Sequence, residues 1–196
     1  MSTVPKKKRM DLAFAALLSA DDAQALTALT RIEQDGDAKA IRPLLEALAS
    51  TKSSAVEQRI AELLYQVKTD NAVNELLAAL DETSLLGVRR VTLAAFWNAG
   101  LDVRDHLERF ITLAIEGDAQ ECFECLTVVE NQEIWPEKAC RLALARVREA
   151  LAKETDEYKA AMLKDLVSVL EFRLGQDEAP ELPLDQDLRG TEAGSV

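Results

Sequence analysis

Three cysteines and one histidine are the residues of this chain whose types could support metal binding or thiol chemistry. Cys122 and Cys125 form a Cys-x-x-Cys pair, whereas Cys140 and His106 stand apart from it. Thiolates in such a pair can share a Zn²⁺ ion, and four nitrogen or sulfur ligands would complete a structural site. However, the sequence has no second Cys-x-x-Cys, and Cys122 falls on one helical stripe with apolar residues, where cysteine packs as a small hydrophobic side chain. We therefore expect the cysteines to pack in a core, with redox chemistry and zinc binding as the alternatives.

The other candidate groups are less specific. His106 follows Arg104 at the start of a predicted helix, a position typical of a surface or half-buried side chain rather than an acid–base catalyst. Glu121 and Glu124 are three residues apart, but a chain with 35 acidic residues contains such pairs by chance. No phosphate-binding glycine loop is present in the sequence. The sequence therefore predicts no catalytic, cofactor-binding or metal-binding residue.

The composition predicts a helical protein. The chain has 196 residues, 48% of them hydrophobic, which is enough for a sizeable core in one domain or one short repeat array. Only 7 Gly and 5 Pro occur, and Ala, Leu and Glu dominate. The odd number of cysteines does not suit a disulfide framework, and the first apolar run, residues 12–18, is too short to span a membrane. We expect an all-α protein in a reducing compartment, the cytoplasm.

Charge is distributed unevenly along the chain, whose net charge is -12. Residues 1–9 carry +4, residues 176–196 carry -5, and the body between them carries -11. We expect residues 1–9 to be a flexible basic leader, residues 10–175 to fold, and residues 176–196, with two Pro and two Gly, to be a disordered acidic tail. A body with this charge repels phosphate, so nucleic acid is not an expected partner.

The leader contains the run PKKKR, in which Lys6, Lys7, Lys8 and Arg9 follow a proline. This run resembles a monopartite nuclear localisation signal, which would act only in a cell with a nucleus. A solvated terminus is the favoured interpretation, and nuclear localisation is the alternative to the cytoplasm.

Between residues 11 and 175, apolar residues recur at helical spacing and are interrupted at fairly even intervals. Asp37, Asp70 and Asp102 lie 33 and 32 residues apart, and each follows one apolar segment and opens the next. We interpret them as helix N-caps in the tight turns of three helical hairpins. The apolar stripe before the turn is Val56, Ile60, Leu63, Leu64 and Val67, repeated as Val88, Thr92, Ala95, Phe96 and Ala99. The stripe after the turn is Ile41, Leu44, Leu45 and Leu48, repeated as Val73, Leu76, Leu77 and Leu80 and as Leu107, Phe110, Ile111 and Ala114.

A looser fourth pair and a final helix follow these three pairs. We predict helices over residues 119–131, 137–154 and 156–174, with a break at Trp135 and Pro136. In the last helix the residues expected to face inward are Tyr158, Met162, Leu166, Val169 and Leu170. Pro43 requires either a kink or a helix that begins close to Arg42, because proline is tolerated in a first turn.

Two of these segments, AVEQRIAELLYQVKTDNAVNELLAAL (residues 55–80) and GVRRVTLAAFWNAG (residues 87–100), resemble the HEAT repeat, particularly its short bacterial form. The resemblance lies in a basic residue early in the first helix (Arg59 and Arg90), the aspartate in the turn and the apolar pattern of the second helix. It covers residues 23–117 and, more loosely, the next pair. It implies a right-handed α–α superhelix, an α-solenoid of about four helical hairpins plus terminal helices.

Stacked helical hairpins bury a continuous core and leave an extended surface that suits the binding of a partner. We therefore expect a non-enzymatic scaffold that binds a protein or peptide, with an enzyme or enzyme subunit of the HEAT-like lyase type as the alternative that the resemblance leaves open. The resemblance places the second helices of the repeats on the concave face. The polar candidates for partner contact on those helices are Arg42, Glu46, Asn74, Glu75, Arg104 and Glu108. An acidic groove with interspersed arginines favours a basic or mixed-charge partner.

Overall fold

A computed structural model describes residues 6–19 and 21–177, which form ten α-helices and three short 3₁₀ helices and contain no strand. The fold class is all-α, as the composition predicted. The α-helices are α1 (Lys6–Leu17), α2 (Asp22–Asp35), α3 (Ile41–Ser50), α4 (Ser54–Tyr65), α5 (Ala72–Leu80), α6 (Arg89–Asn98), α7 (Leu107–Glu116), α8 (Ala119–Asn131), α9 (Glu137–Leu151) and α10 (Glu157–Asp177). The 3₁₀ helices are η1 (Ala38–Ala40), η2 (Thr83–Val88) and η3 (Arg104–His106).

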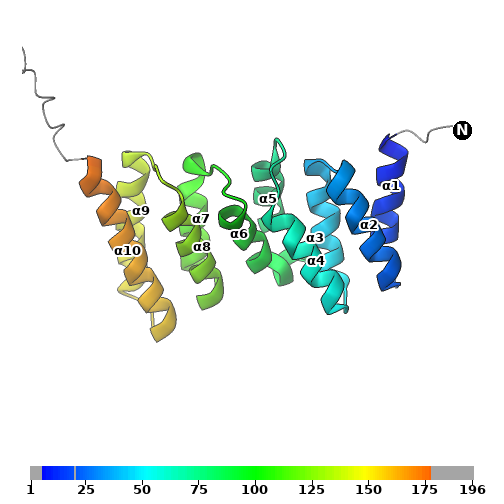
Figure 1. Cartoon of the computed structure of the whole chain (residues 1–196). Coiled ribbons are helices and arrows are strands. Elements are labelled where there is room, and N and C mark those ends of the chain that lie inside the picture. The colour runs from blue at the N-terminus through cyan, green and yellow to red at the C-terminus, as the bar shows by residue number, and fades with distance from the viewer. Residues whose placement is uncertain (1–5, 20, 178–196) are drawn as a thin grey trace, which may run out of the picture.

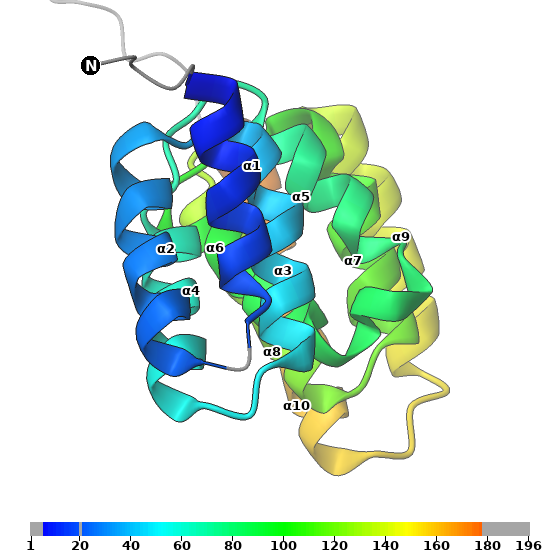
Figure 2. The same ribbon diagram turned by 90° about the vertical axis from the view of Figure 1, so that its right-hand side faces the viewer.

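The helices are arranged in two rows, with α1 at one end of the array and α10 at the other (Figure 1). The even-numbered helices pack side by side from α2 to α10 in one row (Figure 2). In the other row α3 packs against α1 and α5, and α7 packs against α9. The two rows bury a single apolar core between them, which extends from Met10 in α1 to Leu170 in α10.

The predicted apolar stripes form this core. The members in residues 41–48, 88–99 and 107–114 are all buried, whereas Leu63, Val67, Val73 and Leu77 are half-buried. Phe96 of α6 and Phe110 of α7 meet edge to face at the centre of the array, with ring centroids 5.1 Å apart. The helical periodicity therefore identified the core-facing side of each of these helices.

The pairing of the helices differs from the prediction. Among helices that follow one another in the chain, the close pairs are α1 with α2, α3 with α4, α5 with α6, α7 with α8 and α9 with α10. Asp37, Asp70 and Asp102 therefore lie in the connections between close pairs, not in the turns inside them. The reason is the geometry of these connections, since η1 and η3 extend two of them and Asn71, in the left-handed conformation with φ 67°, redirects the third.

The local chemistry of the three aspartates is also not uniform. Asp37 accepts a hydrogen bond from the amide of Lys39 at 2.9 Å, and Asp102 accepts one from the amide of Arg104 at 3.2 Å. Asp37 is therefore the N-cap of η1, as predicted. Asp102 makes only a local turn contact, because the N-cap of η3 is Val103 and that of α7 is His106. Asp70 caps no helix either, because α5 begins after Asn71, a residue type that tolerates the left-handed region.

Pro43 is the third residue of α3, in the first turn, where its missing N–H leaves no hydrogen bond of the helix unmade. The structure therefore resolves the choice between a kink and an early helix start in favour of the early start.

Both ends of the folded body extend beyond the predicted limits. α1 begins at Lys6, so residues 6–9 of the expected flexible leader form the first turn of a helix, and Arg9 pairs with Asp35 at 3.4 Å. α10 continues to Asp177, two residues into the expected tail, and the remainder of both segments lies outside the described residues.

Tyr158 was wrongly expected to face inward, because the buried stripe of α10 runs along Leu163, Leu166 and Leu170. Among the described helices, none is both long and apolar enough to cross a membrane.

Candidate functional site

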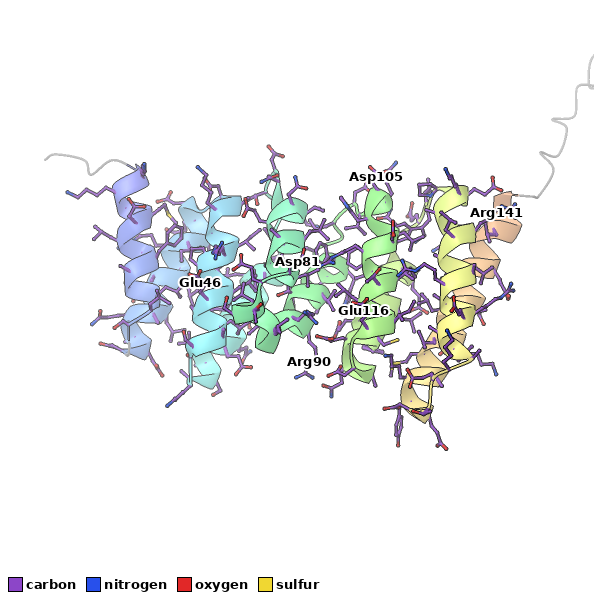
Figure 3. The ribbon with its side chains drawn as sticks, turned by 180° about the vertical axis from the view of Figure 1, so that it is seen from behind. Glu46, Asp81, Arg90, Asp105, Glu116 and Arg141 are labelled. Carbon is purple, nitrogen blue, oxygen red and sulfur yellow. The ribbon has the colours of Figure 1, made fainter. Side chains whose placement is uncertain are left out.

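The exposed sides of α3, α5, α7 and α9, with the connection after α5, form a polar surface that we call the odd-helix face. Figure 3 looks onto it, with Glu46, Asp81 and Glu116 along the array. Among its charged residues are Arg42 and Glu46 of α3, Glu75 of α5, Asp81 and Glu82 after α5, Glu108, Arg109 and Glu116 of α7, and Arg146 of α9.

Arg42 is the best-connected group on this face. Its Nε atom donates to Glu46 Oε1 at 3.0 Å, one helical turn away, and its Nη2 atom donates to Glu82 Oε2 at 2.8 Å. The hydrogen bond to Glu46 and then the charge of Glu82 raise the pKa of the Arg42 guanidinium, to which Glu75 also contributes. Three carboxylates from α3, α5 and the following connection thus surround one arginine.

Two further ion pairs continue along the array. Arg109 of α7 pairs with Asp81 after α5, and Arg146 of α9 lies 3.6 Å from Glu108 of α7. Arg146 also donates to Thr112 Oγ1 at 3.1 Å. Exposed pairs of this kind contribute only about 0–1 kcal/mol to stability, because water screens them. Their main consequence is therefore to hold acids and arginines in an alternating row that solvent can reach.

The structure brings together some of the residues predicted for partner contact and separates others. Arg42, Glu46 and Glu75 form one group, and Glu108 lies farther along the same face. Asn74 is exposed at the start of α5 and donates to Asn71 Oδ1 at 2.6 Å. Arg104 does not belong to the group. It binds Asp102 through a hydrogen bond that lowers the pKa of that carboxyl group, and it lines a separate opening beside the α8–α9 connection.

Sequence reasoning missed five members of the face, Asp81, Glu82, Arg109, Glu116 and Arg146. Glu82 and Arg42 are 40 positions apart, and Arg109 and Asp81 are 28 positions apart. The sequence signal that could have found some of them is the acidic pair Asp81 and Glu82 directly after the apolar run of α5. Residues in such a connection are usually exposed and lie close to the next repeat.

The carboxylate pair Glu121 and Glu124 of α8 is engaged in structural contacts. Arg89 of α6 lies 3.3 Å from Glu121 Oε1, and the indole N–H of Trp97 donates to Glu124 Oε2 at 2.9 Å. His106 is half-buried at the end of η3. In the described part of the chain, no three His, Cys, Asp or Glu side chains are grouped so that they could hold a metal ion.

The three cysteine side chains are all buried, Cys122 and Cys125 in α8 and Cys140 in α9. Burial raises the pKa of Cys122 to about 11 and that of Cys125 well above its ordinary value of 9.0. Because the thiolate is the reactive form, neither thiol of α8 is activated at neutral pH.

We expect Cys122 and Cys125 of the native protein to resist an aromatic disulfide reagent at pH 8 and to react readily in denaturant. The raised pKa of Cys122 also predicts how the stability of the protein changes with pH. The unfolded thiol ionises near 9.0 and the folded one near 11, so the stability that the neutral thiol contributes is complete below pH 9 and declines toward pH 11. Urea melts of the wild type and Cys122→Ala at pH 8 and pH 10 measure this decline as the difference between the two proteins. Labelling of the native protein at the denatured rate would contradict the burial argument.

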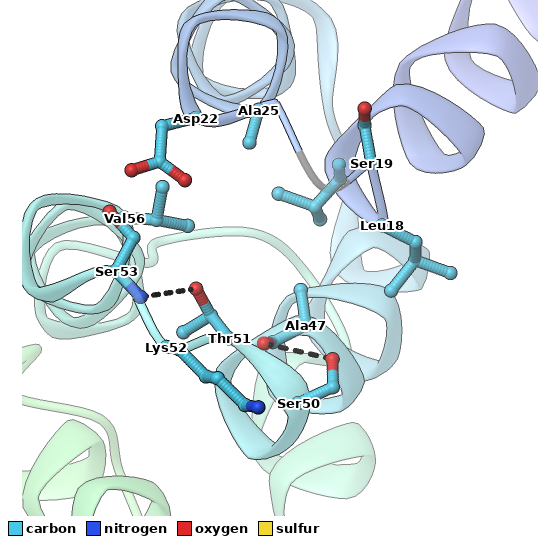
Figure 4. Close-up of a pocket in the computed structure, with 11 residues that line it drawn as sticks. Leu18, Ser19, Asp22, Ala25, Ala47, Ser50, Thr51, Lys52, Ser53 and Val56 are labelled. Atoms are coloured by element: carbon cyan, nitrogen blue, oxygen red, sulfur yellow. Dashed lines mark hydrogen bonds between the residues drawn. The ribbon is translucent and has the colours of Figure 1, made fainter.

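A cavity of about 560 Å³ opens between the α1–α2 and α3–α4 connections (Figure 4). Its charged lining residues are Asp22 and Lys52, and several hydroxyl groups surround them. Ser50 Oγ donates to the carbonyl of Ala47 at 3.2 Å, and Thr51 Oγ1 accepts from the amide of Ser53 at 3.2 Å. These two hydroxyl groups therefore serve the local backbone at the α3–α4 connection, and the described lining residues do not pair a nucleophile with a base.

The described residues thus form an all-helical protein, and the charged residues of its odd-helix face lie mainly on α3, α5, α7 and α9. Comparisons with models of known families, with curated protein sequences and with solved structures find no match to this chain. The functional argument therefore depends on the residues of the chain and their arrangement.

Proposed function

We propose that this chain is a HEAT-like α-solenoid with a right-handed superhelix and that it acts as a non-enzymatic scaffold, binding a protein or peptide partner on the odd-helix face. The row of ion pairs from Arg42 to Arg146 is the observation that carries the proposal. The row presents charged groups from α3, the connection after α5, α7 and α9 on the same side of the array. An extended, solvent-accessible row of this kind suits a partner that lies along the array and exchanges ion pairs with it.

The charges of the face indicate the chemistry of the partner. Acids outnumber arginines among the residues named above, and Glu75 acts on Arg42 through its charge while its Oε1 atom accepts a hydrogen bond from Asn71 at 3.2 Å. Glu75 and Glu116 are thus not held in a direct ion pair between described residues. Charge complementarity favours a basic or mixed-charge partner, whose cations would meet the unpaired acids while its own acids replace Glu46 or Glu82 beside Arg42. Such contacts accelerate encounter and set the register more than they increase affinity.

Replacing Glu46, Glu75 and Glu108 together with Gln is expected to weaken partner capture by at least about tenfold at low salt. The test compares proteins captured from the native host by the wild type and the triple variant, followed by mass spectrometry and by titration of the recovered partner. Glu46 and Glu108 are exposed, and Gln has nearly the same shape as the half-buried Glu75, so the variant should keep the wild-type melting temperature within a few degrees.

The matched control replaces Glu57, Glu130 and Glu133 with Gln, which removes the same charge from exposed positions outside the face. Equal capture by the wild type and the odd-helix variant would refute this location of the binding surface. Equal loss in both variants would show that net charge rather than the face attracts the partner.

A further inference from the structure

The terminal helix α10 exposes two aromatic side chains on the side that faces away from α8 and α9. Tyr158 is 78% exposed and Phe172 is 62% exposed, whereas Leu163, Leu166 and Leu170 on the opposite side are fully buried. α10 packs against α8 and α9 and forms one end of the array (Figure 1). Terminal units of helical arrays normally present a polar outer face, because no further unit covers them. The exposed positions of α10 include the polar residues Glu157, Lys164, Asp165, Ser168 and Glu171, but the two exposed aromatic side chains depart from that rule.

The exposed aromatic residues belong to a regular pattern that we call the α10 stripe. Its members are Tyr158, Ala161, Asp165, Ser168 and Phe172, which are all exposed and follow one another at intervals of three and four residues. This interval places them along one side of the helix, as in the seam of a coiled coil. Read in either direction, the stripe is aromatic, small, Asp, small and aromatic. The stripe is therefore self-complementary to an antiparallel copy of itself.

We propose that the α10 stripe is the contact surface of a two-fold symmetric dimer, in which α10 packs antiparallel against α10 of a second copy of this chain. In a pair centred on Asp165, Tyr158 lies beside Phe172 of the partner subunit, and Ala161 lies within about one residue, or 1.5 Å along the axis, of the level of Ser168 of the partner subunit. The two aromatic residues are about 21 Å apart along the helix axis, so they flank the small residues at the centre. Small central residues allow close helix approach, and a two-fold axis makes each aromatic contact occur twice.

The available area sets the strength of this dimer. An aromatic side chain buries about 150–250 Å² when it is fully covered, and the pair of helices contributes four that are partly exposed. With the small residues and the half-buried Met162 and Val169 at its edge, the contact reaches about the lower limit of a specific interface, near 1,200 Å². The expected dissociation constant is therefore about 10–100 µM.

The negative charge of Asp165 at the centre of the stripe opposes dimer formation. The two Asp165 side chains of the dimer face each other near the axis, and like charges in contact weaken association. Lys164 is exposed beside the stripe and partly offsets this repulsion. Asp165→Asn should therefore lower the dissociation constant of the dimer by about threefold or more. Non-specific association through the exposed aromatic residues would not bring the two Asp165 side chains together and would not change in this way.

Sedimentation equilibrium of the full chain, from about 1 to 200 µM, tests the proposal. The wild type should shift toward twice the chain mass of 21.6 kDa, and Tyr158→Glu or Phe172→Glu should weaken association at least about tenfold. Leu12→Glu in α1 removes an apolar side chain that is 56% exposed at the other end of the array and should have no effect. A wild type that stays monomeric, or a dimer that tolerates Tyr158→Glu, overturns the proposal.

Two other occupants of the stripe are distinguishable in the same experiment. A head-to-tail contact with α1 of a second copy would be weakened by Leu12→Glu and would form longer chains instead of closing. Coverage by residues 178–196 would make the wild type monomeric, and Leu182→Glu would then cause association by uncovering α10. Either result overturns the two-fold dimer.

Disulfide cross-linking tests the antiparallel register directly. When Ala161→Cys and Ser168→Cys proteins are mixed and oxidised with diamide, the mixed dimer should form in preference to cross-links within either variant alone. The two new thiols are oxidised to one disulfide as diamide takes up two electrons and two protons. The native cysteines are buried and serve as the background control in the wild type. Cross-links that form equally within each variant alone would indicate parallel pairing and overturn the proposal.

Discussion

Replacing Phe96 with alanine is expected to lower the free energy of unfolding by about 3–5 kcal/mol. Phe96 is fully buried at the boundary between α6 and α7, where its ring meets Phe110 edge to face. The substitution removes the apolar area and the ring contact, and the surrounding helices cannot close the cavity without shifting both rows. For a chain of this size the melting temperature should fall by about 6–20 °C. Urea and thermal melts followed by circular dichroism measure both quantities.

Phe123→Ala is the matched control, because Phe123 lies in α8 and is 49% exposed. Its substitution should lower the free energy of unfolding by less than about 1 kcal/mol. Similar losses in the two variants would mean that the contact between Phe96 and Phe110 does not hold the centre of the array together.

Replacing Lys159 with methionine is expected to cost about 2–4 kcal/mol, the second largest effect we predict. Lys159 Nζ donates to the carbonyl oxygens of Ile115 and Gly117, at 2.7 Å each, and lies 3.4 Å from the Glu154 carboxylate. Only 11% of the lysine side chain is exposed, so water cannot replace it at these acceptors. The carbonyls mark the C-terminal end of α7, where the helix dipole is negative, and Lys159 thereby ties α10 to the α7–α8 connection.

Lys153→Met provides the comparison for this prediction. Lys153 pairs with Glu149 at 2.6 Å, but both side chains are 71% exposed, so the pair is screened by water. The expected change is within about 0.5 kcal/mol, measured by the same urea melts. If Lys159→Met were as mild as Lys153→Met, the buried lysine would not link the last helix to the array.

The candidate site was predictable only in part. Arg42 and Glu46 are one helical turn apart, so their exposure on one side of α3 followed from periodicity. The contact of Arg42 with Glu82 did not, because the rest of α3 and the whole of α4 and α5 separate their positions in the sequence. Arg104 was assigned to the same surface from its place in the repeat, but η3 precedes α7 and turns Arg104 toward Asp102 instead.

The amino-acid sequence by itself determined the helical class, most helix limits in the repeats and the buried side of most helices, because helix formation and amphipathicity are local. It also indicated that the cysteines of α8 pack in the core, since their spacing matched a buried stripe. Only the tertiary structure decided which helices form close pairs, since that depends on the angles of the connections at Asp37, Asn71 and Asp102. The same packing decided which charges meet across the odd-helix face and which side of α10 is exposed among the described residues, because both depend on neighbours that are distant in the sequence.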